Sequence, residues 1–82
     1  MPHFTKSFVT YDGSVRFSFN RIYTANGIIY FLSFIDKDHK VQSFHMVKNK
    51  QGEWGILDKI IIPEWLQKLE KELAQAILEH RS

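Results

Sequence analysis

Residues 28–35 read Ile-Ile-Tyr-Phe-Leu-Ser-Phe-Ile, and this stretch decides the fold. β-Branched and aromatic residues dominate it, which favours an extended strand. Because successive side chains of a strand point to opposite faces, the even-numbered residues lie on one face, and Ile29, Phe31 and Ile35 lie on the other. Apolar side chains on both faces of a strand predict that both faces are covered.

Turn residues divide the sequence on either side of this segment into further strands. Asp12-Gly13 and Asn26-Gly27 are dipeptides favoured in tight hairpins, because such turns need positive φ angles. Between them, Val15, Phe17 and Phe19 alternate with polar residues, which indicates a strand with one buried face. The expected strands are 4–11, 14–23, 28–35 and 41–48, with a short fifth strand over 54–57.

The apolar spacing changes from that of strands to that of a helix at Pro63. A proline suits the first turn of a helix, where its missing N–H costs nothing. We therefore predict a single domain, 1–82, with a sheet region over 1–62 and one helix over 63–81. The predicted core-facing stripe of the helix includes Trp65, Leu66, Leu69, Leu73 and Ile77.

Short connections favour an antiparallel meander, so the predicted fold is α+β, with four to five strands and the C-terminal helix packed on one face. The helix stripe should meet Val15, Phe17 and Phe19 together with one face of segment 28–35. One helix covers only one face of a sheet. A second copy of the chain is the expected cover for the other face, so we predict a homodimer. A sharply curled sheet folding on itself is the rival explanation.

Composition excludes several classes of protein. The 82 residues contain no cysteine, 44% are hydrophobic and 15% are aromatic, which argues against a disordered chain and against disulfide or thiolate sites. Neither a signal peptide nor an apolar run of membrane-spanning length is evident, so we expect a cytoplasmic protein with no membrane partner.

Catalytic and metal motifs are weak. No histidine pair has the spacing of a zinc-binding helix, and no Gly-rich phosphate loop is present, so we expect no cofactor, no metal and no small-molecule substrate. Asp36, Asp38 and His39 fall in one polar turn. An enzyme, the least favoured interpretation, would require these residues or another ionisable cluster to converge in a cleft.

The predicted sheet region is mildly basic. It carries eight Lys or Arg against five Asp or Glu, a net charge of +3, whereas the helix region has a net charge of −1. Basic side chains among aromatic rings can bind single-stranded nucleic acid by stacking and charge attraction. The candidate contacts for nucleic acid or another partner are Arg16, Tyr30, Lys48, Lys50 and Trp54.

The order of four strands and one helix, from Phe4 to His80, resembles the Whirly and Pur-type single-stranded nucleic-acid-binding domains. The resemblance implies a dimer that binds single-stranded DNA or RNA on a concave sheet, and it assigns no site residue. Segments 21–30 and 63–66 also look like those of small bacterial proteins. From the residues themselves we favour a non-enzymatic homodimeric interaction module, with single-stranded nucleic-acid binding as the alternative.

Overall fold

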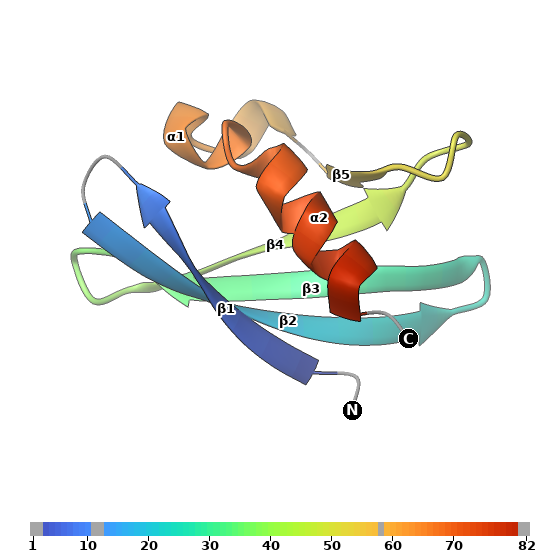
Figure 1. Cartoon of the computed structure of the whole chain (residues 1–82), viewed down its shortest axis with the longest axis horizontal. Helices are drawn as coiled ribbons and strands as arrows, with labels where there is room; N and C mark the ends of the chain where they lie inside the picture. Colours follow the sequence, from blue (N-terminus) through green and yellow to red (C-terminus); the bar gives the residue numbers. More distant parts are fainter. Residues whose placement is uncertain (1–2, 11–12, 58, 81–82) are drawn as a thin grey trace.

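A computed structural model of the chain describes residues 3–10, 13–57 and 59–80. The strands form one antiparallel sheet in the order β1-β2-β3-β4-β5, and helical segments follow (Figure 1). The sheet curls into a half-barrel with the C-terminal helix on one face, which confirms the predicted α+β meander. The elements are β1 (His3–Thr10), β2 (Gly13–Thr24), β3 (Gly27–Ile35), β4 (Val41–Lys48), β5 (Trp54–Ile56), the 3₁₀ turn η1 (Lys59–Ile61), α1 (Glu64–Gln67) and α2 (Glu70–His80).

The β2–β3 hairpin turns where the sequence predicts it. Gly27 has a φ of 122°, a conformation that side-chain-bearing residues rarely adopt. The hydroxyl of Thr24 donates a 2.7 Å hydrogen bond to the carbonyl oxygen of Gly27 and closes the turn. Three residues of the predicted elements, Tyr11, Asp12 and Arg81, lie outside the described residues.

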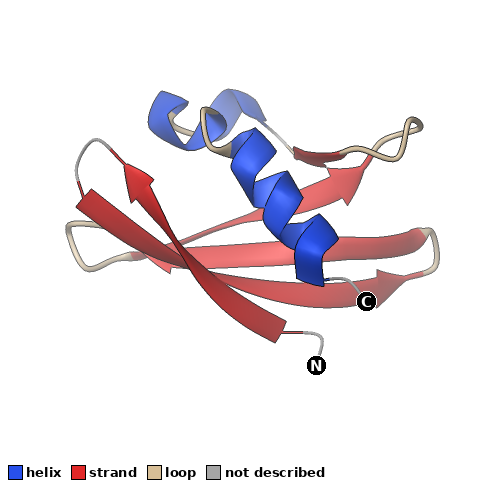
Figure 2. Ribbon diagram, viewed as in Figure 1, coloured by secondary structure: helices blue, strands red, loops and turns tan. Residues whose placement is uncertain are grey.

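The core lies between the inner face of the sheet and the helices, which lie on the same side of it (Figure 2). Phe17 and Phe19 of β2 are fully buried, as are Leu73 and Ile77 of α2, in agreement with the predicted stripe. Trp65 is only partly buried, and its ring meets the Phe34 ring edge-on at 5.5 Å between centroids. The even-numbered face of β3 is therefore the core face.

The helix is broken, contrary to the continuous helix predicted over 63–81. α1 ends at Gln67, α2 begins at Glu70, and the two segments lie at an angle in Figure 1. No Gly or Pro causes the break. The N–H of Leu69 instead donates to the carbonyl of Leu66 three residues earlier, which tightens the turn. Leu66 and Leu69, on either side of the tightened turn, are both buried in the core.

No described element of the chain covers the outer face of the sheet (Figure 2). Ile29, Phe31 and Ser33 of β3 point outward and are half-buried only by their neighbours in the sheet, and Ile35 is 62% exposed. The expectation that β3 is apolar on both faces is thus confirmed, while its second cover is not supplied by the described residues of one copy.

Candidate functional site

The outer face of β2, β3 and β4 is built from cross-strand rows of side chains. Ile22 lies opposite Ile29, and Phe31 lies opposite both Asn20 and His45. The rings of Phe31 and His45 lie 5.1 Å apart between centroids. Ile22, Ile29 and Phe31 therefore form a continuous apolar area at one end of this face.

The same face carries little charge. Among the outward side chains of β2–β4, Arg16 alone has a formal charge with histidine neutral. Towards the β3–β4 turn the apolar pair Ile35 and Val41 is 62% and 72% exposed. Partly exposed apolar side chains with little charge among them are features of surfaces that contact another molecule.

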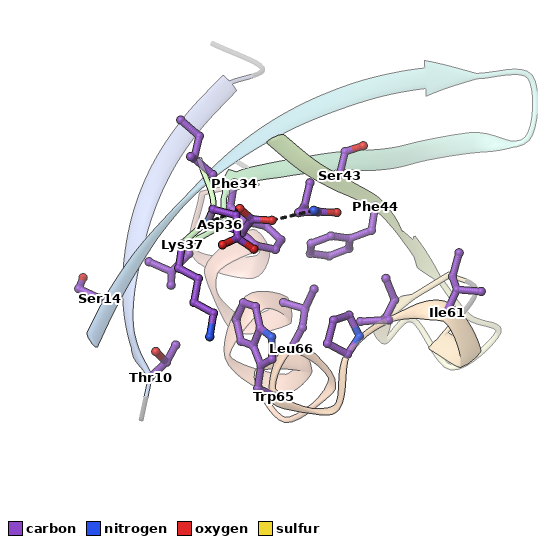
Figure 3. A pocket seen from close by; sticks show the side chains of 16 residues that line it. Thr10, Ser14, Phe34, Asp36, Lys37, Ser43, Phe44, Ile61, Trp65 and Leu66 are labelled. Carbon is purple, nitrogen blue, oxygen red and sulfur yellow. Dashed lines mark hydrogen bonds between the residues drawn. The ribbon is translucent and has the colours of Figure 1, made fainter. Parts of the chain in front are cut away.

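A groove of about 680 Å³ opens at one end of the half-barrel, between the β3–β4 turn and the segment containing η1 and α1 (Figure 3). Phe34, Phe44, Trp65 and Leu66 form its apolar side. Figure 3 shows Asp36 and Lys37 at the edge of this opening. The groove is in the size range of small-ligand sites.

Asp36, the first residue of the suspected acidic cluster, serves the turn itself. Its Oδ1 accepts hydrogen bonds from the backbone N–H groups of Asp38 (2.9 Å) and Lys40 (3.0 Å), and its Oδ2 accepts one from the Gln42 amide (2.8 Å). The bonds from Lys40 and then Gln42 are the main causes that lower the pKa of Asp36. A lowered pKa favours the ionised carboxylate, and in this form Asp36 accepts the hydrogen bonds that hold the turn.

Three of the five predicted contact residues come together at the opposite end of the half-barrel. Tyr30, Lys48 and Trp54 line a hollow of about 840 Å³, and the Lys48 Nζ lies 5.5 Å from the centroid of the Trp54 ring. The Tyr30 and Trp54 rings meet edge-on, with 5.1 Å between their centroids. Tyr30 is 2% exposed and Trp54 7%, so the core covers their faces and no base can stack on them in this conformation.

The remaining two predicted contacts, Arg16 and Lys50, lie elsewhere. Arg16 is on the outer face of β2, opposite Ser7, and Lys50 is in the turn between β4 and β5. The structure therefore does not gather all five residues into one basic surface.

Carboxylates offset part of the basic charge of the sheet region. Lys6 of β1 pairs with Glu79 of α2 at 3.3 Å, and Lys59 of η1 pairs with Glu70 at 2.9 Å. In both pairs the helix supplies the acid. The separate net charges of the two regions thus overstate the positive field of the folded sheet.

Sequence patterns did not predict the groove, because docking of η1 and α1 beside the β3–β4 turn creates it. They also missed a row of outward serines, in which Ser33 faces both Ser18 and Ser43. A serine at an outward position in the middle of each of three adjacent strands was the available signal.

Comparison with known proteins found no matching family model, no matching curated protein and no matching solved structure. Within the described ranges, no helix combines the length and the apolar character needed to cross a membrane.

Proposed function

We propose that the chain is a non-enzymatic interaction module that acts as a homodimer, with the outer face of β2–β4 as the contact between two copies. The observation that carries this proposal is the apolar area of Ile22, Ile29 and Phe31, on a face that none of the described residues of the same copy covers. Burying such a surface is favourable at about 25 cal/mol per Å².

The size of the face is close to what a specific contact needs. β2, β3 and β4 have 12, 9 and 8 residues, and at about 3.3 Å along a strand and about 4.8 Å between strands they cover about 460 Å² before side-chain relief is counted. The lower limit of specific interfaces is about 500 Å² per partner.

The charge of the face favours a second copy over an oppositely charged partner. Arg16 lies near one end of the face, so two faces related by a two-fold axis bring few like charges together. A strongly charged partner would have only the charge of Arg16 to pair with among the outward side chains of β2–β4. The groove beside Trp65 lies on the helix side of the sheet, and this dimer leaves it open to solvent.

Light scattering at tens of micromolar tests the proposal. A particle of twice the 9.7 kDa chain mass is expected, and a 9.7 kDa particle would overturn the homodimer. Phe31→Asp should give a folded monomer, because it places a charge in the contact. Ile60→Asp is the matched control, since Ile60 is 94% exposed in η1, beside the groove residue Ile61, and should leave the dimer intact.

Single-stranded nucleic-acid binding remains a second candidate, with one feature in its favour. Tyr23 is 69% exposed, and the Arg21 guanidinium lies 5.9 Å from the centroid of its ring. Arg21 also lines the hollow that contains Lys48. An exposed ring beside a guanidinium group, next to a hollow that a second cation lines, is an arrangement that can stack on a base and attract its phosphate.

Fluorescence anisotropy with a mixed-sequence oligonucleotide at two salt concentrations tests this candidate. Binding should weaken as salt rises. Tyr23→Ala, which changes no charge, should reduce binding more than the control Lys71→Ala, which removes one positive charge from the helix. Absence of binding at low salt, or binding without salt dependence, rejects the nucleic-acid proposal.

A further inference from the structure

The outer face contains a trough of small hydroxyl side chains that crosses the strands. Thr5 lies opposite Ser18, Ser18 opposite Ser33, and Ser33 opposite Ser43, so four adjacent strands contribute one residue each. Serine and threonine rise much less from the sheet than the residues on either side. The row is therefore a depression across the middle of the proposed contact face.

A ridge of larger side chains lies immediately beside the trough. Asn20, Phe31 and His45 form it on β2, β3 and β4, in register with one another. Each ridge residue stands two positions along its strand from a trough residue. Two residues of a strand span about 6.6 Å, so the ridge and the trough are parallel and about one ring width apart.

We infer that two copies pack with the Asn20–Phe31–His45 ridge of each seated in the partner's serine trough. This inference rests on the proposed homodimer and specifies its contact. A two-fold axis that runs across the strands, midway between ridge and trough, places each ridge over the partner's trough. Under that symmetry Phe31 meets the partner's Ser33, and His45 meets the partner's Ser43.

The alternative of ridge against ridge is physically poorer. Stacked sheets pack about 10 Å apart, and two opposed rows of rings would hold them apart above two empty troughs. Seating each ridge in a trough fills that space. It also gives the buried hydroxyls partners, because an imidazole or a side-chain amide can both donate to and accept from a serine hydroxyl.

Substitutions that fill the trough distinguish this contact from a merely apolar one. Ser33→Phe adds apolar surface to an apolar face, so non-specific association would become tighter. A ridge seated in a trough would instead be blocked, and the dissociation constant measured by sedimentation equilibrium should rise at least about tenfold, or about 1.4 kcal/mol. Ser7→Phe, which adds the same ring on the edge strand outside the trough, should leave the constant close to that of the natural chain.

Exchanging Phe31 and Ser33 in one chain tests the contact most directly. In the double variant Phe31→Ser with Ser33→Phe, the ridge and the trough change places at this point, and the dimer should recover most of its affinity. If Ser33→Phe fails to fold, Ser43→Phe at an exposed position of β4 should give the same loss. Circular dichroism confirms the fold of each variant.

The outcomes separate the two proposals. The ridge-in-trough contact is overturned if folded Ser33→Phe associates as tightly as the natural chain or more tightly. It is also overturned if the double variant stays monomeric. In either case a monomeric Phe31→Asp still supports the outer-face dimer. A dimeric Phe31→Asp, or a natural chain that is monomeric, overturns both.

Discussion

The carboxylate of Glu70, at the start of α2, accepts a 2.8 Å hydrogen bond from the backbone N–H of Ile56 in the short edge strand β5. The same carboxylate lies 2.9 Å from the Nζ of Lys59. One side chain thus joins the edge of the sheet, the η1 turn and the second helix. α2 begins at this residue, directly after the tightened turn at Leu69.

Glu70→Ala should destabilise the fold by about 1.5–3 kcal/mol, the range for a hydrogen bond to a charged group. The N–H of Ile56 would lose its partner in a part-buried position. Urea denaturation measures the change. Glu70→Gln keeps an acceptor and should cost less, and Glu72→Ala on the same helix serves as a control. Equal stability of the Ala and Gln variants would contradict the role of the hydrogen bond.

Phe17 is the centre of the aromatic core, with ring centroids of Phe8, Phe34 and Phe44 between 5.0 and 6.2 Å away. Its side chain is fully buried. Phe17→Ala should cost about 3–5 kcal/mol, the range for truncating a buried ring.

Because small domains have only about 5–15 kcal/mol of stability, the Phe17→Ala variant should melt far below the natural chain or fail to fold. Ile60→Ala, at an exposed position, should change the free energy of unfolding by less than about 0.5 kcal/mol. A Phe17 variant that melts like the Ile60 variant would show that the core lies elsewhere.

The hydrogen bonds of Asp36 indicate how the stability of the fold should change in acid. Hydrogen bonds from Lys40 and Gln42 lower its pKa in the folded state below the 3.8 of an ordinary aspartate. A lowered folded pKa means that the stabilising effect is present above pH about 4 and is lost as pH falls through the folded pKa. The melting temperature of the natural chain should therefore drop between pH 5 and pH 3.

Asp36→Asn should flatten this acid-dependent drop, because the amide cannot change charge over that range. Asp38→Asn is the control, since the Asp38 side chain has no hydrogen bond recorded within the described residues. Thermal melts at several pH values compare the three chains. A drop of the same size in Asp36→Asn would assign the acid response to other carboxylates, such as Glu79, whose pKa Lys6 lowers.

The sequence was sufficient to predict the sheet because its strong signals act locally. Alternation in residues 14–23 and the Asn26-Gly27 turn specify a strand and a hairpin without help from distant residues. The helix break at Lys68 and Leu69 was not predictable in this way, because it follows from contacts made by Leu66 and Glu70 with the sheet.

Burial of the candidate contacts was the least predictable feature. Tyr30 and Trp54 are far apart in sequence, and only the return of β5 beside β4 brings the two rings together. Both are amphipathic side chains that occur equally in cores and in binding sites. Pairing between strands, and not composition, decided that they became core residues.

Trp54→Phe should change the free energy of unfolding little, because the indole N–H that it removes has no hydrogen-bond partner among the described residues. The Trp54 Nε1 is buried, and no acceptor in the described part of the chain lies within hydrogen-bonding distance of it. Burial of an unpaired donor costs about 1–3 kcal/mol. Removing this donor therefore offsets the loss of buried ring area. We expect the free energy of unfolding of Trp54→Phe to differ from that of the natural chain by less than about 1 kcal/mol. Trp54→Ala, which also removes the edge-on contact with Tyr30, should cost about 3–5 kcal/mol.

Urea denaturation of the two Trp54 variants, followed by circular dichroism, measures this difference. The Phe variant leaves Trp65 as the sole tryptophan, so its fluorescence then reports the groove directly. A Phe variant as unstable as the Ala variant would show that the indole N–H makes a stabilising hydrogen bond, with an ordered water as its partner. A small cost for Phe and a large one for Ala would establish that the packing of the ring against Tyr30, and not its polar atom, holds β5 on the sheet.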